Sequence, residues 1–148
     1  FQDFAIDALH RVLNLGIYVY ESKKFQIKNG ESVQGFEFKY DGKFPTSKRL
    51  WIELQERKYP WNPYVPGGIL KENNTWMYCI GDEAIFYVIP VRHLRDYRDK
   101  YKPEERENDR QTSIGYFLPI LNAEGMCAVK IVGGGLAVIR KDEVLKNV

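Results

Sequence analysis

The stretch QGFEFKYDGKFPTSKRLWIELQER, residues 34–57, decides the predicted fold. Residues 35–41 alternate between aromatic and charged side chains, and residues 50–57 alternate between aliphatic and mostly polar ones. A period of two is typical of strands with one buried face. The break between the two segments, residues 42–47, is short and rich in turn residues. The sequence therefore predicts that the segments pair as an antiparallel hairpin.

The predicted hairpin gathers acidic side chains on one face. If the apolar faces of both strands share one core, Glu37, Lys39 and Asp41 face the same side as Glu53 and Gln55. Neighbouring carboxylates repel one another, and they persist mainly where a positive charge lies between them. We therefore expect either a bound cation or basic side chains among these acids.

A divalent cation is the first of two interpretations of these acids. Mg²⁺ binds oxygen ligands, commonly one or two carboxylates together with waters, and Asp41, Glu53 and the backbone carbonyl of Leu54 offer such ligands. In the second interpretation the acids form cross-strand ion pairs on a solvated face of the sheet. The basic partners would then be Lys39, Lys43 and Arg57.

An acid at the end of one strand, a short loop and an apolar strand with the spacing E-x-K resemble the signature of the PD-(D/E)xK nuclease superfamily. Asp41 takes the place of the first acid, and Glu53-Leu54-Gln55 takes that of E-x-K. The segments GESVQGFEFKYD, TSKRLWIEL and NTWMYCIGDEAIFYVIP also resemble uncharacterised bacterial and phage proteins of this superfamily. The resemblance extends over residues 16–101 and implies the restriction-endonuclease-like fold.

This resemblance implies an endonuclease that hydrolyses DNA phosphodiester bonds with Mg²⁺ or Mn²⁺ held by Asp41, Glu53 and Leu54. The sequence departs from the pattern at Gln55, where the family has a lysine. This difference matters because a glutamine cannot carry a proton through the reaction. Lys39 lies on the same predicted face and could take the place of that lysine. The alternative is a catalytically inactive domain of the same fold that binds nucleic acid or a protein partner.

Three further acids are secondary candidates. Glu37 is either another metal ligand or a partner of Lys39. Glu31 lies just upstream of the predicted hairpin, where packing does not account for an acid. Asp7 lies on the polar side of a predicted first helix, where the family often has a metal-binding acid, although a solvated helix face is the simpler and more common explanation.

Two segments are candidates for contact with DNA. Residues 58–75 form a long predicted loop with aromatic and basic side chains, which suit base stacking and phosphate pairing. The alternative is that Trp61 and Tyr64 pack onto the sheet. Residues 91–101 predict a basic helix that either holds a phosphate backbone or forms surface ion pairs. The candidate residues are Lys43, Lys58, Trp61, Arg92 and Arg95.

The remaining pattern predicts one α/β domain over residues 1–148, with a central mixed sheet of five or six strands flanked by helices. The expected elements are a helix at 2–15, strands at 17–20, 113–121 and 126–132, a hairpin of 75–80 with 84–89, a helix at 91–101 and a short final helix after Asp142, with polar connections at 21–30 and 122–125.

Composition narrows the classes of function. The net charge is only +2, which permits a local basic patch rather than a basic coat. No apolar run approaches a membrane span. Cys79 and Cys127 suit reduced core positions, which favours a cytoplasmic location, and the two histidines, His10 and His93, lack neighbours at zinc-ligand spacing. Since nucleases that cut both DNA strands commonly act as pairs, a homodimer is one expected state.

Overall fold

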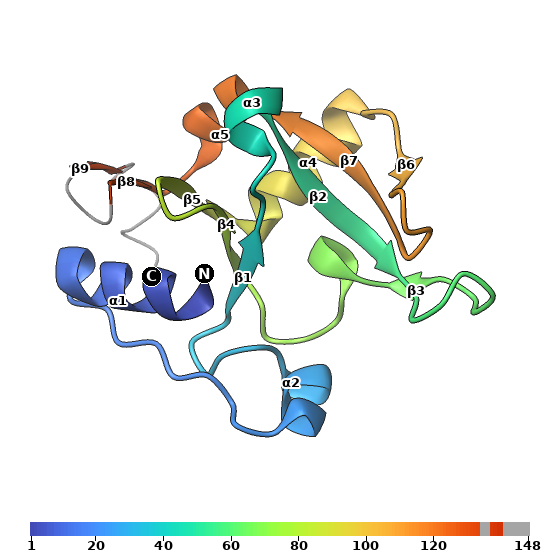
Figure 1. Cartoon of the computed structure of the whole chain (residues 1–148), viewed down its shortest axis with the longest axis horizontal. Coiled ribbons are helices and arrows are strands. Elements are labelled where there is room, and N and C mark those ends of the chain that lie inside the picture. Colours follow the sequence, from blue (N-terminus) through green and yellow to red (C-terminus); the bar gives the residue numbers. More distant parts are fainter. Residues whose placement is uncertain (134–136, 141–148) are drawn as a thin grey trace.

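The computed structural model describes residues 1–133 and 137–140 and has a mixed α/β architecture with two β-sheets (Figure 1). The first sheet is mixed, because β1 and β4 are parallel and its other neighbours are antiparallel. Its order is β1 (Phe36–Tyr40), β4 (Met77–Gly81), β5 (Ile85–Pro90), β8 (Val129–Val132) and β9 (Ala137–Arg140). The second sheet is antiparallel, in the order β3 (Val65–Pro66), β2 (Arg49–Glu56), β7 (Ser113–Pro119) and β6 (Arg106–Glu107).

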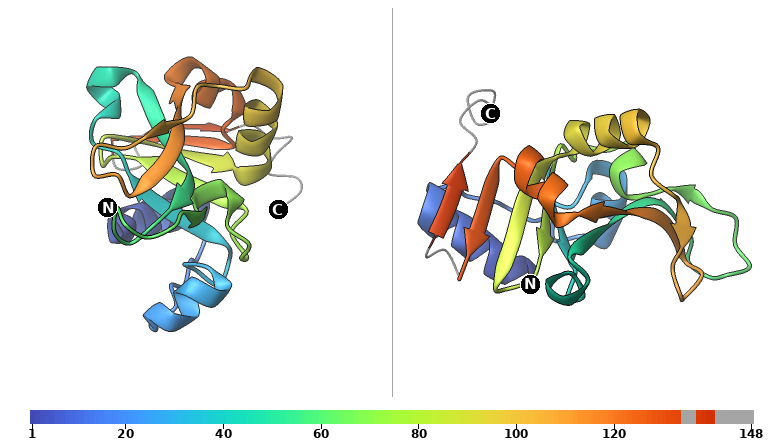
Figure 2. Two further views of the ribbon diagram at one scale, coloured as in Figure 1. Left: turned by 90° about the vertical axis from the view of Figure 1, so that its right-hand side faces the viewer. Right: turned by 90° about the horizontal axis from the view of Figure 1, so that it is seen from above.

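Helices complete the layers. The helices of the described residues are α1 (Gln2–Leu13), α2 (Lys23–Asn29), α3 (Phe44–Ser47), α4 (Val91–Tyr101), α5 (Ile120–Met126) and the short 3-10 helix η1 (Gly68–Leu70). Helix α1 lies against one face of the five-stranded sheet, and the β2–β7 pair lies on the other side (Figure 2). None of the helices in these residues is long and apolar enough to cross a membrane.

The described residues form two apolar cores, one on each face of the five-stranded sheet. Phe36 and Phe38 of β1 pack in the core beneath α1. Leu50, Ile52 and Leu54 of β2 pack in the other core, which also includes β4, β5 and α4. Glu37 and Lys39 alternate with these aromatic residues along β1. Their side chains therefore point away from α1 and toward the side of the sheet where β2 lies.

The predicted hairpin of residues 35–41 with 50–57 is wrong. Strand β1 pairs in parallel with β4, and β2 pairs with β3 and β7. The prediction required both apolar faces to share one core, whereas each serves a different core. Helix α3 fills the connection, and its buried Phe44 joins the β2 core, which carries the chain from one sheet to the other.

Several other predicted elements are confirmed with small changes of boundary. The first helix ends at Leu13, where Asn14 adopts the left-handed conformation. The hairpin of residues 75–89 forms β4 and β5, and Pro90 precedes helix α4 as predicted. The prediction of a mixed sheet holds for the five-stranded sheet, but a second sheet of four strands was not anticipated.

The wrong local predictions all concern short elements. Residues 17–20 contribute only the bridge between Val19 and Ser32, and residues 21–30 contain α2, which Ser22 caps through the Phe25 amide. The predicted strands at 113–121 and 126–132 are confirmed as β7 and β8, but the predicted polar connection at 122–125 lies within helix α5. The predicted final helix falls outside the described residues.

Candidate functional site

Lys39 of β1 lies among acidic side chains that come from separate parts of the chain. Its Nζ is 2.7 Å from Oε1 of Glu37 and 4.0 Å from Oε1 of Glu53 on β2. The Glu37, Glu53 and Lys39 side chains are 10%, 20% and 35% exposed, so water screens these charges only in part. We call the group formed by Glu31, Glu37, Glu53, Glu56, Lys39 and Lys71 the carboxylate cluster.

The loop before β1 places Glu31 beside this group. The buried Ser32 hydroxyl donates to the carbonyl of Phe36 and accepts the Phe36 amide, both at 2.8 Å, which folds the loop against the start of β1. The Glu31 carboxylate accepts a hydrogen bond from the Phe38 amide, and the charges of Glu37 and Lys39 affect its pKa. The strand and the loop that precedes it therefore supply two acids to the same site.

A β-bulge in β2 determines which side chains accompany Glu53. The pairing of β2 with β7 shifts between Glu53 and Gln55, as expected when an extra residue enters one strand. The Gln55 side chain is exposed, whereas Glu56 binds Lys71 at 3.2 Å and lies close enough to Glu53 to affect its pKa. Gln55 therefore does not take the place of the family's lysine beside Glu53.

Close backbone packing holds the bulge in place. Gly68, at φ 48°, lies against the backbone of Glu53 so closely that a Cβ atom there would approach the Glu53 carbonyl carbon to 2.6 Å. A residue with a side chain is therefore excluded by contact as well as by the left-handed conformation. The first turn of η1 thus fixes the backbone that carries Glu53.

Burial and like charges shift the pKa values within the carboxylate cluster. Burial, with contributions from Glu56 and Glu37, raises the pKa of Glu53 despite the opposing effect of Lys39. Burial works to lower the pKa of Lys39, but the Glu37 and Glu53 carboxylates outweigh it and keep this pKa above its usual value. Four carboxyl groups face two ammonium groups, so the cluster carries excess negative charge when all of them are ionised.

Tyr78 of β4 adds a polar atom to the same region. It is paired with Glu37 in the β1–β4 register, so both side chains lie on the same face of the sheet. The Tyr78 side chain is 1% exposed, and its hydroxyl has no hydrogen-bond partner among the described residues. Burial first, and then the nearby carboxylates of Glu37 and Glu53, raise the pKa of Tyr78 well above its usual value. An unpaired buried hydroxyl is costly and calls for an explanation.

Comparison of the chain with models of known protein families, with curated proteins and with solved structures gave no match. The function must therefore be argued from the site itself. Within the described residues, no three Asp, Glu, His or Cys side chains already form a group that could hold a metal ion. The Lys39 ammonium group instead binds Glu37 and lies near Glu53.

Of the predicted metal ligands, Glu53 lies in the carboxylate cluster, while the other two have structural partners. The Asp41 carboxylate accepts the backbone amides of Trp51 at 2.9 Å and Lys43 at 3.1 Å, so it ties the α3 connection to β2. The carbonyl of Leu54 accepts the amide of Gly67 at 2.9 Å. These contacts account for Asp41 and Leu54 without a metal ion.

The secondary candidates Glu37 and Glu31 lie in the cluster, whereas Glu56, Lys71 and Tyr78 were missed. Their sequence positions are far from one another, and only the bulge and the pairing of β1 with β4 bring them close. One signal was present in the sequence. Glu37-Phe38-Lys39 has the spacing E-x-K with the lysine present. The prediction from sequence placed this motif one strand later, at Glu53-Leu54-Gln55.

The predicted DNA contacts have different surroundings. Lys43, Lys58 and Arg92 are exposed, and Trp61 does not pack onto the sheet. Arg95 donates through Nε to the carbonyl of Ile69 at 2.6 Å, so part of its side chain supports η1. Asp7, the secondary candidate on α1, binds Arg11 one turn away at 2.8 Å on an exposed surface.

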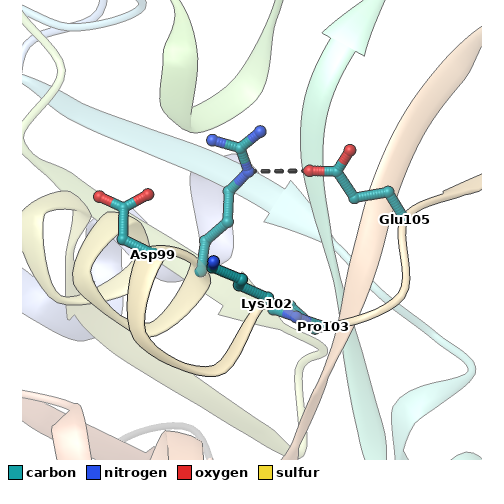
Figure 3. Close-up of a pocket in the computed structure, with 5 residues that line it drawn as sticks. Asp99, Lys102, Pro103 and Glu105 are labelled. Carbon is teal, nitrogen blue, oxygen red and sulfur yellow. Dashed lines mark hydrogen bonds and ion pairs between the residues drawn. The ribbon is translucent and has the colours of Figure 1, made fainter.

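A hollow of about 470 Å³ at the end of α4 is unsuited to phosphate binding (Figure 3). Its lining residues carry balanced charges, and Arg98 binds Glu105 at 2.9 Å. The lining comprises Arg98, Asp99, Lys102, Pro103 and Glu105.

We expect Glu31 to make the fold less stable as pH rises. Burial and the neighbouring Glu37 raise its pKa from 4.5 to about 7 in the folded state, although Lys39 opposes this. Between these two values the folded chain retains a proton that the unfolded chain has released, so the free energy of unfolding decreases through this pH window. Thermal unfolding of Glu31→Gln should show a weaker decline from pH 4.5 to 7 and a higher midpoint than wild type at pH 8. An equal decline in both proteins would contradict the assignment.

Proposed function

We propose that this chain is a metal-dependent endonuclease of the PD-(D/E)xK type that hydrolyses DNA phosphodiester bonds. The observation that carries the proposal is the convergence of Glu37 and Lys39 from β1 with Glu53 from β2. The E-x-K spacing of Glu37-Phe38-Lys39 supplies the lysine that Gln55 does not. The mixed sheet with a helix on one face is compatible with a restriction-endonuclease-like fold.

The donor chemistry of the carboxylate cluster fits a hard divalent cation. Partly buried carboxylate oxygens are the ligands that Mg²⁺ and Mn²⁺ prefer, and the excess negative charge favours a cation there. The hydroxyl of Tyr78, which has no hydrogen-bond partner among the residues that the structure describes, is a further polar group on the same face available to a water or a ligand. Glu37 and Glu53 would hold the ion, with Glu31 beside them, whereas Asp41 and Leu54 would retain their backbone partners.

Lys39 would position a water or a phosphate oxygen beside the ion in this proposal. A bound Mg²⁺ or Mn²⁺ would lower the pKa of a coordinated water and stabilise negative charge on a phosphate oxygen. The carboxylates of Glu37 and Glu53 keep Lys39 protonated, so its ammonium can donate a hydrogen bond to a water or to a phosphate oxygen. Binding of the ion would compete with the Glu37–Lys39 ion pair and free Lys39 for this contact.

Cleavage of supercoiled plasmid DNA tests the proposed function. We expect nicked and linear products with Mg²⁺ or Mn²⁺, and none when EDTA is present. Intact plasmid in all conditions at micromolar protein would overturn the nuclease proposal.

A non-catalytic domain of the same fold, binding nucleic acid or a protein partner, is the second candidate. It is favoured by the short ion pair between Lys39 and Glu37, because an internal ammonium group there already compensates the carboxylate. In this case the carboxylate cluster would be structural. Absence of metal binding would favour this candidate.

A further inference from the structure

The loop between β2 and β3 presents an aromatic pair to solvent. The rings of Tyr59 and Trp61 are stacked with their centroids 4.7 Å apart and their planes at 8°. Trp61 is 77% exposed and Tyr59 is 43% exposed. This loop projects beyond both sheets, at the end of the molecule next to β3 (Figures 1 and 2). An exposed tryptophan with one ring face covered by a tyrosine leaves the other face available to a planar ligand.

Hydrogen bonds hold this loop in its observed form. Asn62 binds Tyr59 twice, because its backbone amide donates to the Tyr59 carbonyl at 3.0 Å and its Oδ1 accepts the Tyr59 amide at 3.2 Å. Arg57 donates to the carbonyls of Asn62 at 3.2 Å and Gln111 at 2.8 Å. Its guanidinium also lies 4.0 Å from the centre of the Tyr64 ring. The aromatic pair is therefore presented by a braced loop, which lowers the entropy lost on binding.

The charges beside the pair suit a phosphate. Arg57 is compensated by Glu107 at 3.2 Å. Lys58 lies 5.3 Å from the centre of the Tyr59 ring, is exposed, and has no carboxylate within ion-pair distance in the described part of the chain. Arg110 is likewise exposed. It precedes Gln111, whose carbonyl accepts the hydrogen bond from Arg57. An aromatic ring face next to an uncompensated cation is the combination that binds single-stranded nucleic acid.

We propose that Tyr59 and Trp61 form a stacking platform for an unpaired DNA base, with Lys58 on an adjacent phosphate. A base inside a duplex has both faces covered by its neighbours, so only an unpaired or terminal base can stack on Trp61. A protein partner is disfavoured, because the immediate sequence neighbours of the two rings are Lys58, Asn62 and prolines rather than a run of large apolar side chains.

This platform specifies the substrate class of the proposed nuclease as DNA with an unpaired segment, which negatively supercoiled plasmid exposes transiently, and to that extent it rests on the proposed function. The β2 strand links the two sites. Glu53 lies on β2 and Arg57 directly follows its last residue, so the two are four residues apart, roughly 13 Å at the usual rise per residue. The platform and the carboxylate cluster are therefore joined by one strand and the loop that follows it.

Binding of fluorescently labelled single-stranded dT20, measured by anisotropy in EDTA and low salt, tests the platform independently of cleavage. We expect Trp61→Ala to weaken binding by about 5- to 150-fold, the range for loss of one stacked base, and Trp61→Phe to retain part of the affinity. A blunt duplex of equal length exposes base faces only at its two ends, so Trp61→Ala should weaken its binding much less than that of dT20. Lys58→Gln should reduce the slope of the logarithm of the binding constant against the logarithm of the salt concentration by about one.

Leu121→Ala is the matched control, because Leu121 is 85% exposed on α5, away from the loop. It removes an exposed apolar side chain and should leave dT20 binding unchanged. Equal affinity of wild type and Trp61→Ala for dT20, equal losses on single-stranded and duplex DNA, or no binding by wild type would each overturn the platform. Failure of plasmid cleavage with retained dT20 binding would overturn catalysis alone.

Discussion

Glu37→Gln and Glu53→Gln should each reduce Mg²⁺-dependent plasmid cleavage by about 100-fold or more, the usual cost of removing a group that stabilises charge in the transition state. Each substitution keeps the shape of the side chain and removes one negative charge from the carboxylate cluster. The loss should appear in the rate constant for nicking at saturating protein, measured on gels over time. Both variants should remain folded, because Lys39 still has Glu53 nearby in Glu37→Gln and keeps its ion pair with Glu37 in Glu53→Gln.

Two controls separate this assignment from the one that the sequence suggested. Glu83→Gln removes a carboxylate from the exposed β4–β5 turn and should cleave at the wild-type rate. Asp41→Asn keeps one carbonyl oxygen to accept the backbone amides of the α3 connection, so it should lower stability more than the cleavage rate. Wild-type rates in both Glu37→Gln and Glu53→Gln would remove the carboxylate cluster from catalysis. A loss confined to Asp41→Asn would restore the sequence-based assignment.

Lys39→Met should destabilise the fold by about 3 kcal/mol at pH 8, toward the lower end for a broken buried ion pair because Lys39 is one third exposed. Methionine fills the space of the aliphatic chain but leaves Glu37 and Glu53 facing each other without a cation. The loss should be measured by urea unfolding. A millimolar divalent cation should recover a large part of it, because the ion supplies the missing positive charge.

The acidity of the cluster provides an internal check on Lys39→Met. The pKa values of Glu31 and Glu53 are raised, so these two carboxyl groups take up protons by pH 4 and the difference between wild type and variant should shrink. Lys24→Met, at an exposed position of α2, should stay within about 0.5 kcal/mol of wild type at both pH values. A Lys39→Met protein as stable as wild type at pH 8 would mean that Lys39 contributes no net compensation.

Periodicity in the sequence predicted individual elements better than it predicted their pairing. The β4–β5 hairpin and α4 were predictable, because a tight turn or a proline separates long apolar or helical patterns. The β1–β2 pairing was not, because alternation tells which residues share a face but not which core that face meets. Phe38 and Ile52 look equivalent in sequence, yet they pack in different cores.

The candidate site was predicted only in part. Its residues come together, but not through the hairpin that the sequence predicted. Glu37 and Glu53 were expected to converge as cross-strand neighbours, whereas they approach Lys39 from strands of different sheets. Asp41 could not be assigned from sequence, because an acid that caps a turn and an acid that binds a metal occupy the same position of a strand-loop pattern. Glu56 and Lys71 depend on a bulge that alternation does not reveal.

The most direct test of the carboxylate cluster as a cation site is thermal unfolding of wild type and Glu53→Gln during a titration with Mn²⁺. A ligand specific to the folded state stabilises it by about 2.7 kcal/mol at a hundred-fold excess over its Kd, which corresponds to roughly 5–10 °C for a chain of this size. We predict such a rise for wild type and little or none for Glu53→Gln. No shift of wild type at millimolar Mn²⁺, or equal shifts in both proteins, would contradict the central claim.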